Sequence, residues 1–115
     1  MIGGIEAEER ALRYLLAEGL TLIARNWRCR AGELDLVMRH GDTLVVAEVR
    51  GRGRNDFGTA AETVGPRKQR RIVRATRLLL TQKAELADAP LRFDIVTLDG
   101  AGEIEWLRAA FEVEE

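Results

Sequence analysis

The chain has 115 residues, of which 46% are hydrophobic and 32% are charged, and its formal net charge at neutral pH is −1. This length suits one hydrophobic core, so we expect a single domain over residues 1–115, since domains typically contain about 100–150 residues. No apolar run approaches the ~20 residues that span a bilayer, and the acidic N-terminal segment is unlike a secretory signal peptide. We therefore expect a cytoplasmic protein without membrane partners. The single cysteine excludes an internal disulfide and a multi-cysteine zinc site.

The charges are distributed unevenly along the chain. Residues 50–77 contain nine arginines and lysines but only two acidic residues, a local balance of +7, so the rest of the chain sums to −8. A positive segment on a weakly acidic protein is typical of a surface that meets phosphate groups. A solvated helix face without a partner is the alternative interpretation.

The first half of the chain predicts one helix and three strands. Apolar residues at helical spacing indicate an amphipathic helix over residues 5–19, which ends at a glycine. A short strand is expected at 20–24. The apolar and alternating runs 33–39 and 43–50 are separated by a turn-rich link, so they predict a β-hairpin.

The second half predicts a loop, a long helix and two strands. Residues 51–58 are rich in glycine and arginine and read as a loop, whereas Pro66 suits the first turn of a helix over 66–80. Strands are expected at 91–98 and 103–113. The core-facing residues of the helix are predicted to be Ile72, Ala75, Thr76 and Leu79. Arginines recur on another face of it at positions 67, 70, 71, 74 and 77.

The predicted order of elements is α-β-β-β-α-β-β. A mixed β-sheet flanked by helices accommodates this order, because the helix at 66–80 is long enough to connect two parallel strands. We therefore predict an α/β fold in which this helix packs with one face and presents positive charge with the other.

Two acidic residues of the hairpin carry the chemical signal. The apolar run 44–49 is interrupted near its end by Glu48, a carboxylate that would be costly to bury without a partner. The hairpin can bring Asp35 close to it, and adjacent carboxylates repel unless one is protonated or a cation lies between them. A hard divalent ion such as Mg²⁺ or Mn²⁺ meets that need. Ion pairs with Arg50 and other arginines are the alternative.

Several separate motifs indicate a family. An E-x-x-A-x-x-Y-L-x-x-x-G pattern runs from Glu8 to Gly19, and it is followed in order by GELDLV, AEVRGR, FGTAAETV, PRKQRRI and RFDIV. Together they cover about residues 4–111 and resemble the YraN-like family of small bacterial proteins. That family in turn resembles PD-(D/E)XK nucleases, in particular archaeal Holliday-junction resolvases and the tRNA-endonuclease-like fold. The resemblance implies a restriction-endonuclease-like mixed sheet and a metal-dependent endonuclease, with branched DNA as one substrate.

The same resemblance implies roles for single residues. Asp35 and Glu48 would bind Mg²⁺ or Mn²⁺, with the Val49 carbonyl as a backbone ligand, and Glu8 matches the helical glutamate that completes such catalytic sites. Arg50 occupies the place of the usual catalytic lysine. An arginine stays protonated and cannot act as a general base, although it can stabilise charge that develops on a phosphate.

We expect the basic segment to bind the nucleic-acid backbone, that of DNA in preference to RNA. The residues concerned are Arg52, Arg54, Arg67, Lys68, Gln69, Arg70, Arg71 and Arg74. The resemblance places Lys68 and Gln69 near the metal site, and resolvase-like relatives suggest a homodimer. Three functions remain open: an endonuclease, a non-catalytic nucleic-acid-binding module with the same fold, and a domain whose arginines meet an acidic protein.

Overall fold

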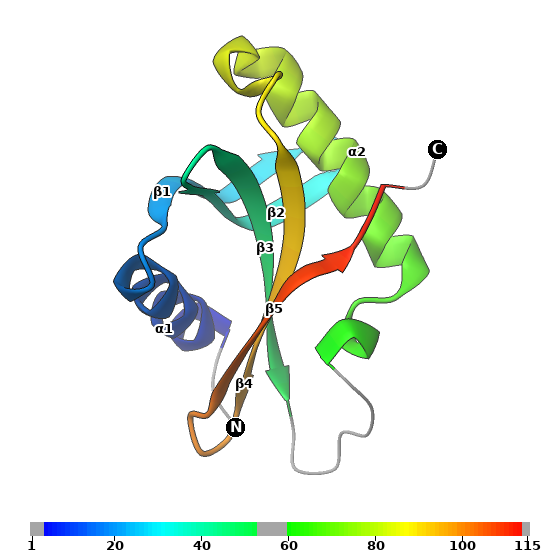
Figure 1. Ribbon diagram of the computed structural model, residues 1–115. Helices are drawn as coiled ribbons and strands as arrows, with labels where there is room; N and C mark the ends of the chain where they lie inside the picture. Colours follow the sequence, from blue (N-terminus) through cyan, green and yellow to red (C-terminus); the bar gives the residue numbers. More distant parts are fainter. Residues whose placement is uncertain (1–3, 53–59, 114–115) are drawn as a thin grey trace.

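A computed structural model describes residues 4–52 and 60–113 and shows a five-stranded β-sheet with a long helix on each face (Figure 1). The elements are α1 (Gly4–Ala17), β1 (Thr21–Cys29), β2 (Gly32–His40), β3 (Thr43–Arg52), the 3₁₀ helix η1 (Ala60–Thr63), α2 (Pro66–Gln82), the 3₁₀ helix η2 (Ala84–Leu86), β4 (Leu91–Asp99) and β5 (Ile104–Phe111). This α/β architecture confirms the predicted order α-β-β-β-α-β-β. None of the described helices is long and apolar enough to cross a membrane.

The strands lie in the sheet in chain order, from β1 at one edge to β5 at the other. All neighbours are antiparallel except β3 and β4, which run parallel from the pair Leu44 and Leu91 to the pair Arg52 and Asp99. A parallel pair needs a long crossover connection. Helix α2 provides it, as predicted, and β3 becomes the central strand of the sheet.

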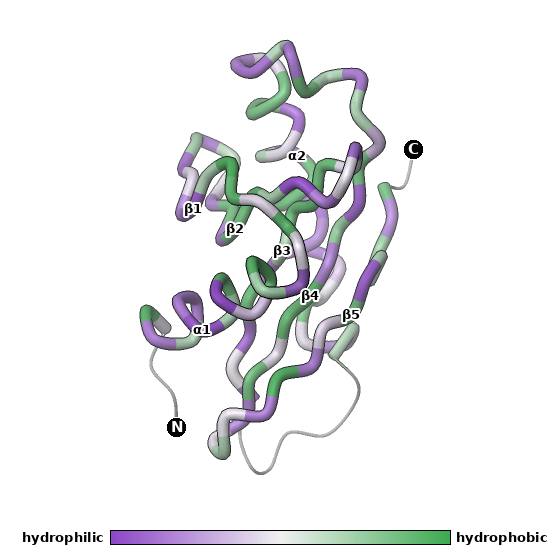
Figure 2. Tube along the Cα trace, turned by 60° about the vertical axis from the view of Figure 1, so that its left-hand side comes forward, coloured by the Kyte–Doolittle hydropathy of each residue, from purple (hydrophilic) through white to green (hydrophobic). Residues whose placement is uncertain are grey.

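Helix α1 covers one face of the sheet. Its apolar stripe follows helical spacing, so Figure 2 shows hydrophilic and hydrophobic positions alternating along it. Gly19, with a φ of 97°, follows the helix in the left-handed conformation that glycine adopts without strain. The buried residues of α1 are Ala7, Ala11, Leu12 and Leu15. They pack against Leu36, Met38, Val45, Ala47, Val96 and Leu98 of the sheet.

Helix α2 covers the other face. It begins at Pro66, as predicted, and its buried residues are the four that the sequence indicated, Ile72, Ala75, Thr76 and Leu79. On the sheet they meet Leu34, Val37, Leu44, Val46, Phe93 and Ile95. Because the apolar stripe of α2 is fully used by this contact, its arginines are left on the outer side.

Three details of the prediction differ from the structure. The strand expected at 20–24 extends through Asn26, which has a φ of 50°, to form the single strand β1. The start of the expected loop, at 51–52, continues β3. The two 3₁₀ helices were not predicted, because three or four residues carry no helical period. Residues 53–58 of the expected loop lie outside the described residues.

Asp94, in the middle of β4, is a completely buried acid with a full set of partners. Arg92 donates to it from Nε at 2.9 Å and from Nη2 at 3.0 Å, and both the Trp106 indole N–H and the Ala109 backbone N–H donate at 2.9 Å. These contacts span an irregularity in the pairing of β4 with β5. Since buried polar groups are stable only when hydrogen-bonded, Asp94 is a structural residue that joins the two strands.

We expect Asp94→Asn to lower the free energy of unfolding by about 3–5 kcal/mol, because it leaves the half-buried Arg92 guanidinium without its carboxylate partner. Urea denaturation measures the loss. Glu112→Gln, at an exposed position next to β5, is the control and should change the free energy by less than about 0.5 kcal/mol. A loss below about 1 kcal/mol for Asp94→Asn would contradict the structural role.

Candidate metal centre and nucleic-acid interface

The hairpin of β2 and β3 opens into a fork at the site. The ladder of paired residues ends at Leu36 and Ala47, although both strands continue beyond that pair. Past it, side chains replace backbone partners: the Val49 N–H donates to Asp35 Oδ2 at 2.9 Å, and the Asp35 N–H donates to Glu48 Oε2 at 3.3 Å. The two carboxylates predicted to lie close together therefore do so, and each is held by a backbone amide of the other strand.

The environment of these carboxylates disfavours negative charge. Glu48 is only 1% exposed, and burial, followed by the charge of Asp35, raises its pKa from 4.5 to about 8. Burial also raises the pKa of Asp35, against the opposing effect of the Val49 N–H. Glu48 Oε1 is buried and has no hydrogen-bond partner among the described residues. Such an oxygen requires either a proton or a nearby cation.

Lys68 supplies positive charge to this oxygen. Its Nζ lies 3.8 Å from Glu48 Oε1, which is within ion-pair range but longer than a hydrogen bond. Lys68 belongs to the first turns of α2, and its side chain is one-third exposed. Gln69, the next residue, instead donates to the Val64 carbonyl at 2.9 Å and closes the segment that leads into the helix. Of the two helix residues expected near the site, Lys68 is thus the one whose charged group lies within ion-pair distance of a predicted metal-binding carboxylate.

Glu8 approaches the site from α1. Its pKa is raised first by burial and then by the charge of Asp35, and a hydrogen bond from Asn26 lowers it. Asn26 lies in β1 between Arg25, which pairs with Leu36, and Trp27, which pairs with Leu34, so it stands opposite Asp35. Its left-handed backbone is one that asparagine tolerates better than other non-glycine residues.

Sequence reasoning missed Asn26. An asparagine within a strand-like segment was the available signal, because the residue type favours turns and left-handed positions over regular strands.

Arg50 is directed to a different partner. Its Nε and Nη2 donate to the Thr63 carbonyl at 3.1 and 2.9 Å, which ties β3 to η1. Its charge lowers the pKa of Asp35 and of Glu48, in both cases less than the charge of Lys68 does. Arg50 therefore links β3 to η1 next to the site. Among the described residues, its guanidinium forms no ion pair with either carboxylate.

The donor set fits a hard divalent cation that keeps much of its water. Within residues 4–52 and 60–113, no group of three or more His, Cys, Asp or Glu side chains is arranged to hold a metal ion. Mg²⁺, however, commonly uses only one or two carboxylates together with water. Asp35 and Glu48 offer two carboxylates, one oxygen of which is buried without a hydrogen bond. The metal-binding role of the Val49 carbonyl and the catalytic role of Glu8 stay predictions.

The arginines of α2, the helix that carries Lys68, form an exposed basic face. In the part of the chain that the structure describes, none of them takes part in an ion pair, and Arg71 approaches Gly32 at the β1–β2 turn. The members of this arginine face are Arg67, Arg70, Arg71, Arg74 and Arg77. Arg52 differs, because its Nη1 lies 3.6 Å from Glu105 Oε1 on β5. Arg54, also predicted to bind nucleic acid, lies outside the described residues.

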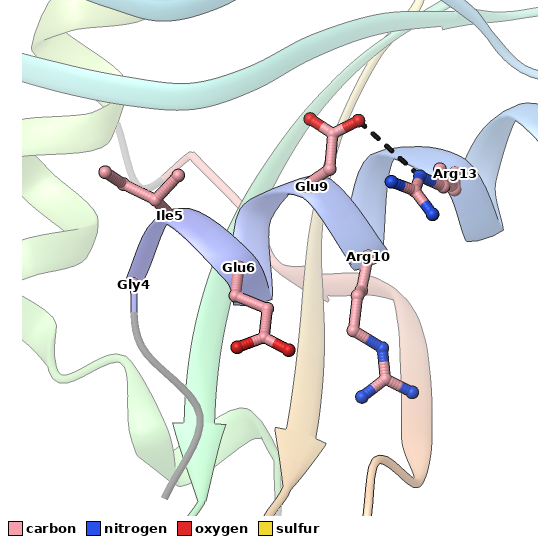
Figure 3. A pocket seen from close by; sticks show the side chains of 6 residues that line it. All are labelled: Gly4, Ile5, Glu6, Glu9, Arg10 and Arg13. Carbon is pink, nitrogen blue, oxygen red and sulfur yellow. Dashed lines mark ion pairs between the residues drawn. The ribbon is translucent and has the colours of Figure 1, made fainter.

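A shallow pocket lies elsewhere, along the N-terminal half of α1. It is lined by Gly4, Ile5, Glu6, Glu9, Arg10 and Arg13. Figure 3 shows that Glu6 and Arg10 extend to one side of the helix, whereas Glu9 extends to the other and pairs with Arg13 at 3.6 Å. Its charged groups do not converge on a common point, and neither Asp35 nor Glu48 lines it.

Comparison with known proteins identifies the family. The family model described as "Uncharacterised protein family UPF0102" matches residues 7–98, a stretch that includes Glu8, Asp35, Glu48 and Lys68. The chain belongs to this family. The UPF0102 protein of Pseudomonas putida strain F1 is 50% identical over 113 residues, which cover 95% of this chain and 92% of the relative. That of Pseudomonas entomophila strain L48 is 48% identical over the same shares. The YraN-like membership inferred from the motifs is thereby confirmed.

The raised pKa of Glu48 makes stability depend on pH. Because the folded state retains the proton between about pH 4.5 and 8 and the unfolded state does not, the contribution of Glu48 to the free energy of unfolding is lost as the pH rises through this window. We expect Glu48→Gln to become more stable than the parent across it, by about 2 kcal/mol or more at the alkaline end.

Urea denaturation at about pH 5, 6.5 and 8 without divalent ions checks this result. Glu85→Gln, on the exposed surface of η2, is the control and should follow the parent. Parallel pH profiles for Glu48→Gln and the parent would contradict the raised pKa.

Proposed function

We propose that this protein is a metal-dependent endonuclease that hydrolyses nucleic-acid phosphodiesters, those of DNA before those of RNA. The observation that carries the proposal is the Glu48 oxygen that is buried without a hydrogen-bond partner, next to a second carboxylate and beside exposed arginines. A buried polar atom without a hydrogen bond is costly, and buried acids with shifted pKa values tend to occur at functional sites. Phosphate is the ligand that suits both a hard cation and an arginine face.

The site offers the groups that phosphodiester hydrolysis needs. Mg²⁺ or Mn²⁺ bound by Asp35 and Glu48 would supply Lewis acidity toward a phosphate oxygen and an acidified water. In the reaction a water oxygen bonds to phosphorus and releases one proton to solvent, the bond from phosphorus to the leaving oxygen breaks, and that oxygen takes up one proton from solvent. The arginine face would bind the flanking phosphates. The homodimer that the resemblance implies stays a prediction.

The second candidate is a nucleic-acid-binding module that does not hydrolyse its ligand. The observation in its favour is Arg50, which is engaged by the Thr63 carbonyl and, being permanently protonated, cannot accept a proton from water. In this case the carboxylate pair would bind a cation that bridges the protein to a phosphate. The two candidates share the metal and the arginine face, and they differ only in bond cleavage.

We expect Asp35→Asn and Glu48→Gln each to weaken Mn²⁺ binding by tenfold or more, because each removes a charged oxygen ligand. Titration calorimetry provides the measurement, with Glu85→Gln as the control that should bind like the parent. Under the nuclease hypothesis the same two variants, or addition of a chelator, abolish cleavage of a labelled branched duplex. Unaltered Mn²⁺ affinity in both variants would remove the metal centre.

We expect the double change Arg70→Ala and Arg74→Ala to weaken binding to all DNA sequences alike, because these residues would contact phosphates and not base edges. The slope of log affinity against log salt should fall by about two, close to one per lost phosphate contact.

The matched control is Arg13→Ala with Arg108→Ala, which removes the same charge from exposed positions of α1 and β5. Equal losses in the two double variants would show that only net charge matters, which would contradict a binding face on α2.

A further inference from the structure

Two cations influence the carboxylate pair, Arg50 from β3 and Lys68 from α2, and they differ in how firmly the rest of the protein holds their charged groups. This distinction rests on the proposed function, because it concerns which residue meets the phosphate beside the metal. The two side chains differ in their contacts, in exposure and in the chemistry of their charged groups.

Arg50 is committed to the framework. Two of its nitrogens, Nε and Nη2, donate to the single carbonyl of Thr63, and the Thr63 hydroxyl in turn donates to the Ala60 carbonyl at 2.6 Å. These bonds hold η1 against the end of β3. Moving the guanidinium to a phosphate would leave the Thr63 carbonyl without these donors, and the loss of bonds to a charged group is substantial.

Lys68 is held less firmly than Arg50. Its ammonium lies 3.8 Å from Glu48 Oε1, which is too long for a hydrogen bond, so the donor capacity of the ammonium is not satisfied there. The side chain is one-third exposed, whereas Glu48 is 1% exposed, so Lys68 extends from the solvent side toward the buried oxygen. The Lys68 ammonium is therefore more accessible to a ligand from solvent than the Glu48 oxygen is.

The position of Lys68 also joins the two halves of the proposed site. Residues three and four apart on a helix lie on one face, so Lys68 is a neighbour of Arg71 on α2. Arg71 belongs to the arginine face, and Glu48 belongs to the carboxylate pair. Lys68 is thus the point at which a backbone bound along the arginines would come next to the metal centre.

We propose that Lys68 is the residue that contacts the substrate phosphate beside the metal, and that Arg50 is a positioning residue that fixes η1 against β3. In the free protein the Lys68 ammonium lies next to Glu48 Oε1. The ammonium is repelled from any cation held by Glu48, and its flexible four-carbon stem allows it to move to the nearest anion, a phosphate oxygen. The same lysine therefore lies near the carboxylate before ligands bind and near the phosphate afterwards.

The test compares Lys68→Met with Lys83→Met, a matched change at the residue that follows the far end of α2. Methionine keeps the apolar stem and removes the charge. The first measurement is Mn²⁺ affinity by calorimetry without nucleic acid. We expect Lys68→Met to bind Mn²⁺ as well as the parent or several-fold more tightly, because the competing ammonium has gone from Glu48.

The second measurement is the gain in affinity for a phosphorothioate duplex, which resists hydrolysis, when Mn²⁺ is added. We expect this gain to fall by tenfold or more in Lys68→Met, to return in part in Lys68→Arg, and to remain parental in Lys83→Met. Cleavage of the natural duplex should fall by about 10²–10³, the usual effect of removing one group that stabilises transition-state charge. Arg50→Gln should differ, with a lowered urea midpoint but a retained Mn²⁺-dependent gain.

Three outcomes would overturn the assignment of Lys68 and leave the proposed function standing. A Lys68→Met protein that loses Mn²⁺ affinity as Glu48→Gln does would make Lys68 a support of the carboxylates, and a parental gain in DNA affinity would remove it from the phosphate. Loss of that gain in Arg50→Gln alone would transfer the role to Arg50. If the parent itself neither binds Mn²⁺ nor gains DNA affinity with it, the proposed function fails and takes this assignment with it.

Discussion

The central constraint of this structure is a carboxylate pair inside a β-sheet. Glu48 lies on the central strand, almost inaccessible to solvent, and its pKa of about 8 means that ionisation at neutral pH opposes folding. Regular pairing of β2 and β3 would have satisfied the backbone without any acid. Instead the strands diverge, and the carboxylates of Asp35 and Glu48 accept hydrogen bonds from backbone N–H groups that are not paired across β2 and β3. A local arrangement that opposes stability in this way is typical of a functional site.

The arrangement of the sheet explains why so many elements can reach this pair. Because β3 is the central strand, both helices pack within reach of its end, α1 on one face and α2 on the other. Glu8 comes from α1 and Lys68 from α2, while Asn26 on β1 stands opposite Asp35 and hydrogen-bonds to Glu8. Residues distant in sequence therefore meet where β2 and β3 diverge, although within the hairpin Asp35 and Glu48 are only thirteen residues apart.

Periodicity and residue type were sufficient to predict the layers of the fold and the carboxylate pair. The apolar stripe of α2 and the interrupted run that ends in Glu48 are local patterns, which can be recognised without knowledge of distant segments. The contacts that the sequence could not show are those between segments that lie far apart along the chain. The diversion of Arg50 to Thr63 requires the position of η1, and the pairing of Arg52 with Glu105 requires the neighbouring β5. The role of Asn26 was not predicted, because a single residue with left-handed backbone conformation alters a strand without ending it.

Two buried acids of this chain show how a structural carboxylate differs from a functional one. Asp94 accepts hydrogen bonds from three residues, and one of them, Arg92, pairs with both of its oxygens, so no oxygen of Asp94 awaits a ligand. Glu48 has one amide donor and a distant ammonium, and one of its oxygens has no hydrogen bond within the described chain. Burial is nearly the same for both residues, and the difference lies in compensation. A folded protein can place a guanidinium against an acid when only stability is at stake, as it does for Asp94, so the incomplete hydrogen bonding of Glu48 supports our proposal of a cation that comes from outside the chain. The exposed arginines on the adjacent helix then indicate the anion that such a cation would accompany.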